Sequence, residues 1–118
     1  MVRPYTILVA DDDPSLLDVL AMILREPGYT VLTAGDAYEA IRVLADRHVD
    51  LMVADVRMPG LTGPELSLQA KVMRPKLHLI FITGYAVSPE TAQQGRVIPK
   101  PIRSAALLKI VEQELSAI

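Results

Sequence analysis

The chain has 118 residues, with 12 Lys and Arg against 14 Asp and Glu, a formal net charge of −2 and no cysteine. This length favours one domain over residues 1–118, and the lack of cysteine excludes disulfides and thiolate metal sites. The acidic balance, a single Phe and the absence of Trp offer little to bind nucleic acid directly, and no apolar run is long enough to span a membrane. The stretch before the acidic cluster is too short for a signal peptide, so with no cysteine we expect a cytoplasmic protein.

The first predicted elements are a strand and an amphipathic helix. Residues 5–10 form an unbroken apolar run, which is typical of a strand buried on both faces. Asp13 then provides a helix cap and Pro14 a first helical residue. The helix ends at Pro27-Gly28. Its predicted buried stripe is Leu16, Val19, Leu20, Ile23 and Leu24, with Ala21 and Met22 off that stripe.

Strand and helix signals alternate along the rest of the chain. Further strands are predicted over residues 30–34, 50–54, 77–82 and 96–98. Helices are predicted around Ala40 and Leu44, around Leu66 and Ala70, after Ser88-Pro89, and from near Ser104. The fourth of the five helices has few residues before Gly95 and is therefore short. This alternation predicts an α/β fold with a five-stranded parallel sheet and helices on both faces.

Polar residues stand at the ends of four predicted strands. They are the pair Asp11 and Asp12, then Asp55, Thr83 and Lys100. Parallel strands share one direction, so all of these side chains are expected at one edge of the sheet, where open α/β sheets bind their ligands.

Three carboxylates crowded at one edge repel each other unless a cation lies between them. Mg²⁺ takes oxygen ligands and combines carboxylates with water and substrate phosphate, which predicts a phosphoryl-transfer site. In this hypothesis Asp55 attacks phosphorus, and Asp11 and Asp12 hold the metal. Thr83 and Lys100 bind phosphoryl oxygens.

Four segments together resemble the receiver domain of two-component response regulators. They are residues 7–14 (ILVADDDP), 55–60 (DVRMPG), 82–85 (ITGY) and Lys100-Pro101. The resemblance implies a flavodoxin-like, doubly wound sheet of order 2-1-3-4-5. It also implies phosphorylation of Asp55 by a histidine kinase or histidine phosphotransfer protein, with Mg²⁺ or Mn²⁺ as cofactor. The Arg57 backbone carbonyl would be a third metal contact, and the Lys100-Pro101 bond would be cis.

The chain departs from the receiver pattern at two places. Val97 stands where the family carries an aromatic switch residue, and the span from Thr83 to Lys100 is shorter than in typical members. The shortening resembles receivers associated with hybrid histidine kinases. We therefore expect the partner to dock on the first helix, through Ala21 and Met22, and on the loop at Lys100-Pro101.

Two other functions remain open from the sequence. The first is a phosphatase resembling haloacid dehalogenases, with Asp11 as nucleophile and Asp13 as general acid, although this leaves Asp55 without a role. The second is an interaction module that is never phosphorylated. A stand-alone protein and a fragment of a larger one are equally compatible with the sequence, and His48 and His78 are not spaced as metal ligands.

Overall fold

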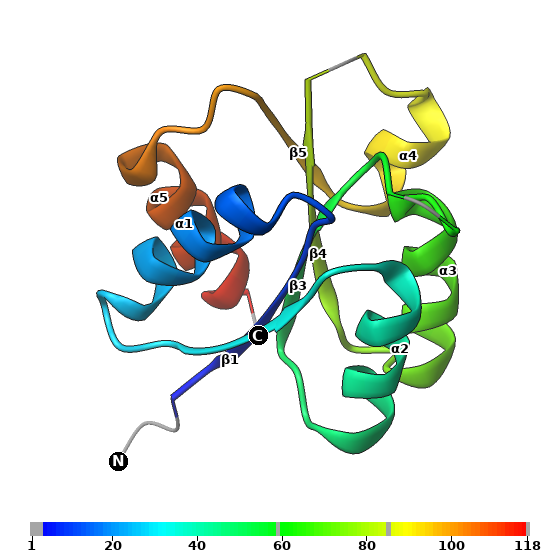
Figure 1. The fold of residues 1–118 in the computed structure, drawn as a ribbon, viewed down its shortest axis with the longest axis horizontal. Helices are drawn as coiled ribbons and strands as arrows, with labels where there is room; N and C mark the ends of the chain where they lie inside the picture. The colour runs from blue at the N-terminus through cyan, green and yellow to red at the C-terminus, as the bar shows by residue number, and fades with distance from the viewer. Residues whose placement is uncertain (1–3, 59, 85, 118) are drawn as a thin grey trace.

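A computed structural model of the chain describes residues 4–58, 60–84 and 86–117. These residues form five strands and five helices in strict alternation (Figure 1). The elements are β1 (Thr6–Ala10), α1 (Pro14–Arg25), β2 (Thr30–Ala34), α2 (Ala37–Asp46), β3 (Leu51–Asp55), α3 (Gly63–Met73), β4 (His78–Thr83), α4 (Pro89–Gln94), β5 (Arg96–Pro99) and α5 (Ser104–Leu115).

The sheet is parallel throughout and has the order β2-β1-β3-β4-β5, as predicted. α1 and α5 cover one face, and α2 and α3 cover the other (Figure 1). Alternate side chains of the central strands enter two apolar cores, so Ile7 and Val9 lie with α1 and α5, whereas Leu8 and Ala10 lie with α2 and α3. Burial of both faces explains why the strands read as continuous apolar runs.

Local capping sets where the first three helices begin. The Asp13 carboxylate accepts the backbone N–H groups of Ser15 and Leu16, as the sequence predicts, and Asp36 caps α2 in the same way. α3 begins with a reciprocal capping box between Thr62 and Glu65. Each cap satisfies N–H groups that have no partner within the helix.

The predicted buried stripe of α1 is wrong at two positions. Ala21, which we expected to be available to a partner, is only 2% exposed, whereas Val19 is 48% exposed and Met22 is 68% exposed. The reason is that α1 contacts α5 as well as β1 and β2. Its buried arc is therefore turned toward Ala21, whose small side chain fits in the core beside α5.

The region between β4 and α5 matches its predicted shape. α4 spans only Pro89–Gln94, and it is tied to α3 by the Ser67 hydroxyl, whose Oγ lies 2.6 Å from Oε1 of Gln94. The Lys100-Pro101 bond is cis. Within the described part of the chain, no helix combines the length and the apolar character needed to cross a membrane.

Candidate functional site

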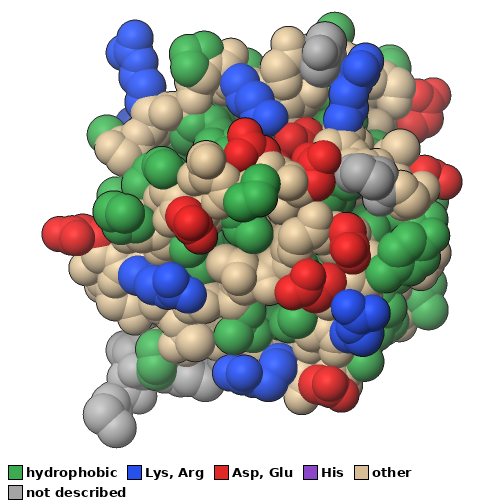
Figure 2. Space-filling model, in the orientation of Figure 1, with side chains coloured by type: hydrophobic (Ala, Val, Ile, Leu, Met, Phe, Trp, Pro, Cys, Tyr) green, Lys and Arg blue, Asp and Glu red, His purple; other side chains and the backbone are tan. Residues whose placement is uncertain are grey.

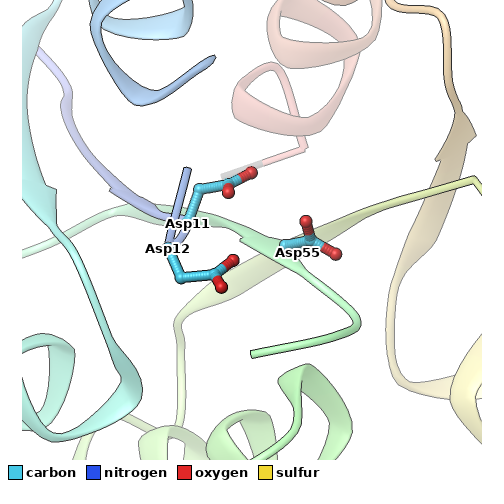
Figure 3. A group of neighbouring side chains, drawn as sticks. All are labelled: Asp11, Asp12 and Asp55. Carbon is cyan, nitrogen blue, oxygen red and sulfur yellow. The ribbon is translucent and has the colours of Figure 1, made fainter. Parts of the chain in front are cut away.

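Three carboxylates meet at the carboxyl ends of β1 and β3. These strands are neighbours, with Ala10 paired to Ala54, so Asp11 and Asp12 leave β1 beside Asp55. One oxygen from each of the three lies within 4.8 Å of the others (Figure 3). Figure 2 shows acidic side chains gathered near the top of the view, with Lys and Arg side chains beside them. The predicted convergence of these residues at one edge is therefore present.

Asp11 is the most deeply buried member of this group. It is only 1% exposed, and its Oδ1 accepts the Asp13 backbone N–H at 2.9 Å. Burial raises the pKa of Asp11 to about 6, and the charges of Asp55 and Asp12 add to this effect, whereas the Asp13 N–H and the Lys100 charge oppose it. Its Oδ2 is buried and has no hydrogen-bond partner among the residues that the structure describes.

Asp55 is held from two directions at the last position of β3. Its Oδ1 accepts the Arg57 backbone N–H at 2.9 Å, and its Oδ2 accepts a hydrogen bond from Lys100 Nζ at 2.9 Å. Burial acts to lower the pKa of Lys100, but the hydrogen bond and charge of Asp55, together with the charges of Asp11 and Asp13, outweigh it and raise that pKa. Lys100 therefore remains an ammonium group facing the carboxylate.

Thr83 and Lys100 are brought together by the pairing of β4 with β5. Thr83 ends β4 and is 2% exposed, and its backbone carbonyl accepts the Lys100 N–H at 2.8 Å. On β5, Val97 pairs with Phe81 and is partly buried, so an aliphatic side chain occupies the position expected for an aromatic switch. The motif residues Pro59 and Tyr85 lie outside the described residues.

The charges of this cluster favour a cation. Three carboxylates face one ammonium group, and the unpartnered Asp11 Oδ2 is a buried acceptor for which the described residues supply no donor. Carboxylate oxygens are the ligands that hard divalent cations prefer. The residues present therefore fit Mg²⁺ or Mn²⁺.

A separate hollow of about 400 Å³ lies at the opposite, amino end of the sheet, between His48 and Leu77. Its polar groups already serve the fold. Asp50 accepts the Thr6 N–H at 2.8 Å and pairs with His48 at 2.9 Å, and Arg74 donates to the Leu44 carbonyl at the end of α2. This hollow is therefore not the candidate site, and His48 lies beside it as a partner of Asp50.

Comparison with known proteins agrees with this geometry. The family model of the response regulator receiver domain matches residues 7–112. The chain belongs to the response regulator receiver family. It is 33% identical to the transcriptional regulatory protein GlrR of Escherichia coli K12 over 96% of this chain. The match covers 27% of GlrR, so this receiver spans about a quarter of the length of that relative.

Solved receiver structures are similar over almost the whole chain. A receiver domain protein of Methanospirillum hungatei JF-1, described as CheY-like, is 30% identical with a TM-score of 0.91, covering 98% of this chain and 96% of that one. TrrA of Thermotoga maritima, a response regulator solved in complex with Mg²⁺-BeF, is 27% identical with a TM-score of 0.85. That match covers 92% of this chain and 97% of TrrA. These matches confirm the predicted flavodoxin-like fold.

The phosphatase alternative finds no support in this receiver. The Asp13 carboxylate, which would be its general acid, is engaged by the backbone of Ser15 and Leu16 at the start of α1. Asp55, which that alternative left without a role, is the carboxylate that Lys100 contacts.

Sequence reasoning missed one residue that shapes the site. A Cβ atom at Gly63 would lie 2.5 Å from the Asp55 carbonyl oxygen, so only glycine lets α3 begin this close to β3. The sequence signal was present in the Thr62-Gly63-Pro64 turn, but nothing local reveals what that glycine faces.

Proposed function

We propose that this receiver accepts a phosphoryl group on Asp55 from a histidine of a kinase or phosphotransfer protein. The observation that carries the proposal is the contact of buried Asp55 with Lys100, beside the carboxylates of Asp11 and Asp12. A carboxylate oxygen of Asp55 attacks phosphorus. The phosphorus–nitrogen bond of the donor then breaks, its electron pair returns to the imidazole, and Asp55 becomes an acyl phosphate.

Asp11, Asp12, Asp55 and the Arg57 backbone carbonyl would hold Mg²⁺ or Mn²⁺. Support for this comes from the buried, unpartnered Oδ2 of Asp11 and from the short distances among the three carboxylates. When bound, the cation supplies positive charge that neutralises the phosphoryl oxygens. Burial and the neighbouring carboxylates raise the pKa of Asp11 because they destabilise its negative charge. A bound cation would stabilise that same charge.

Lys100 and Thr83 would bind the transferred group. Lys100 donates a hydrogen bond to an oxygen of unmodified Asp55. After phosphorylation, its ammonium group would donate to a phosphoryl oxygen instead. The Thr83 hydroxyl, at the end of the neighbouring strand, would donate to another oxygen. Movement of Thr83 would shift the chain that follows β4, which is the route by which the new charge reaches a partner-binding surface.

The decisive experiment is intact-mass analysis after incubation with acetyl phosphate and Mg²⁺. We expect a mass gain of one phosphoryl group, its loss with a chelator, and its loss in Asp55→Asn. As a matched control, Asp46→Asn removes an exposed carboxylate at the end of α2 and is expected to label normally.

Two results would contradict the proposal. Labelling that survives in Asp55→Asn but disappears in Asp11→Asn would favour the phosphatase chemistry. A wild-type protein that stays unlabelled with every donor tried would favour an interaction module without phosphorylation.

We further propose that the histidine-bearing partner docks on α1 and on the Lys100-Pro101 loop. Val19 and Met22 are exposed apolar side chains on α1, and Met22 borders a hollow that Asp18 and Arg25 also line. These residues replace Ala21, which is buried. An apolar surface of this kind suits a partner that presents the apolar face of an amphipathic helix.

This docking proposal has a test that separates binding from chemistry. Met22→Asp is expected to slow phosphoryl transfer from a phosphorylated histidine protein, and to leave labelling by acetyl phosphate unchanged. Val72→Asp is the matched control, because Val72 is 83% exposed on α3, across the sheet from α1. Equal slowing by both variants, or by neither, would contradict docking on α1.

A further inference from the structure

The ring of Tyr38 contacts the loop that links β3 to α3. Tyr38 lies in the first turn of α2, and a Cβ atom built on Gly60 would be 2.6 Å from Tyr38 Cε2 and 3.3 Å from its Cζ. Gly60 also has a φ of +84°, which side-chain-bearing residues rarely adopt. The loop therefore turns at Gly60 with the aromatic ring directly against its backbone.

The same loop carries backbone groups of the candidate site. It leaves β3 at Asp55 and provides the Arg57 N–H that binds Asp55 Oδ1. It also carries the Arg57 carbonyl that we propose as a metal ligand. Mg²⁺ requires near-octahedral geometry at short distances, so a displacement of this loop weakens its binding.

The described residues on both sides of Gly60 are anchored in the core, because Met58 is buried and Leu61 packs against the same cluster of α2 and α3 side chains. The α3 end of the loop is anchored by the hydrogen bond from Gly63 N to Val56 O and by the capping box of Thr62. Toward Asp12, however, the loop borders a hollow of about 350 Å³ lined by Arg57, Met58 and Thr62. At Gly60 itself, between these anchored residues, the Tyr38 ring lies against the loop backbone from the side of α2.

The chain just before Tyr38 also supports the other acidic segment. The carbonyl of Ala34, at the end of β2, accepts the backbone N–H of Asp11 at 3.1 Å. The connection from β2 to α2 therefore contacts both chain segments that bring carboxylates to the site.

We infer that Tyr38 is a positioning residue that sets the affinity of the site for Mg²⁺ by holding the β3–α3 loop at Gly60. The inference rests on the proposed function, because it requires that the carboxylate cluster bind the cation. We expect it to depend on the ring more than on the hydroxyl group, since a Cβ atom at Gly60 would lie 2.6 Å from a ring carbon and 3.4 Å from the hydroxyl oxygen.

The test is a titration of the protein with Mg²⁺, in which calorimetry measures the affinity and NMR records the backbone amide signals. Loss of a supporting contact around a metal site typically weakens binding about tenfold or more, so we expect roughly tenfold for Tyr38→Ala and less than about twofold for Tyr38→Phe. Leu68→Ala removes a side chain of similar exposure, 59% against 55% for Tyr38, from α3 and is expected to bind Mg²⁺ as the wild type does. The Arg57 amide signal is expected to shift in Tyr38→Ala only.

A double-mutant cycle tests the contact itself. Gly60→Ala places a methyl group against the ring, so it is expected to weaken Mg²⁺ binding more in the wild type than in Tyr38→Ala, where the ring is absent. If Tyr38→Ala does not fold, Tyr38→Leu, which keeps apolar bulk but not the ring, replaces it with the same expected direction.

The outcomes separate this inference from the proposed function. A wild-type protein that binds no Mg²⁺ overturns both. A wild type that binds Mg²⁺ and labels at Asp55, together with unchanged affinity in Tyr38→Ala and strict additivity with Gly60→Ala, overturns only the role of Tyr38.

Discussion

Replacing Asp11 by Asn is expected to stabilise the protein when no divalent cation is present. The amide keeps an oxygen for the Asp13 N–H and removes a charge that is buried beside two other carboxylates. The pKa of Asp11 rises from an ordinary value of 3.8 to about 6 in the fold. A shift of this size corresponds to no more than about 3 kcal/mol.

The sign of the pH dependence follows from proton linkage. Between pH 3.8 and about 6 the folded protein holds a proton on Asp11 that the unfolded chain has released, so the free energy of unfolding of the wild type falls as pH rises through this window. Asp11→Asn lacks this titration. The stability advantage of Asp11→Asn is therefore close to zero below pH 3.8, grows through the window, and is constant above it.

Thermal unfolding followed by circular dichroism, in chelator from pH 4 to 8, measures this difference. For a chain of this length the upper limit corresponds to a rise of roughly 10 °C in the midpoint at pH 8. Mg²⁺ is then expected to stabilise the wild type and not Asp11→Asn. Asp46→Asn is the control for a change in net charge. An advantage of Asp11→Asn that does not change with pH would refute the reasoning, because it would show that burial of the charge is not its source.

Three further predictions follow from contacts in the fold. Gly63→Ala places a methyl group 2.5 Å from the Asp55 carbonyl and is expected to cost about 1–3 kcal/mol in urea unfolding; a cost near zero would contradict the close approach of α3 to β3. Arg74→Met removes donors to the Leu44 and Arg47 carbonyls, and the free energy of unfolding is expected to fall by about 1–2 kcal/mol. Lys76 is exposed, so Lys76→Met is expected to leave that free energy unchanged, and equal losses in the two variants would contradict a stabilising role of Arg74 at the end of α2. Lys100→Met removes a charge that lowers the pKa of Asp11, so the Asp11 carboxyl carbon observed by NMR should titrate at higher pH, and an unchanged midpoint would show that this charge does not act on Asp11.

Local signals made most of the secondary structure predictable. The cap at Asp13, the proline at position 14 and the stop at Pro27-Gly28 act within a few residues of each other, so they are readable without the fold. The convergence of Asp11, Asp55 and Lys100 was predictable for a different reason, because parallel strands that alternate with helices all end at the same edge.

The burial of particular side chains was not predictable, because it depends on neighbours that are distant in sequence. Val19 fits the helical period of α1 as well as Ala21 does, and only the position of α5 decides that Ala21 is buried and Val19 exposed. The same holds for Gly63, whose lack of a side chain matters only because the Asp55 carbonyl lies against it.

The sequence by itself predicted which residues gather at one edge of the sheet, whereas the tertiary structure decided their burial and their partners. Asp11 and Asp12 are adjacent and chemically identical, yet packing buries Asp11 and exposes Asp12, and the described part of the chain offers no hydrogen-bond partner to Asp11 Oδ2. Lys100 reaches Asp55 across 45 residues only because β5 pairs with β4 and β4 with β3. Desolvation and charge coupling depend on distances in space, and these distances exist only once the sheet has formed.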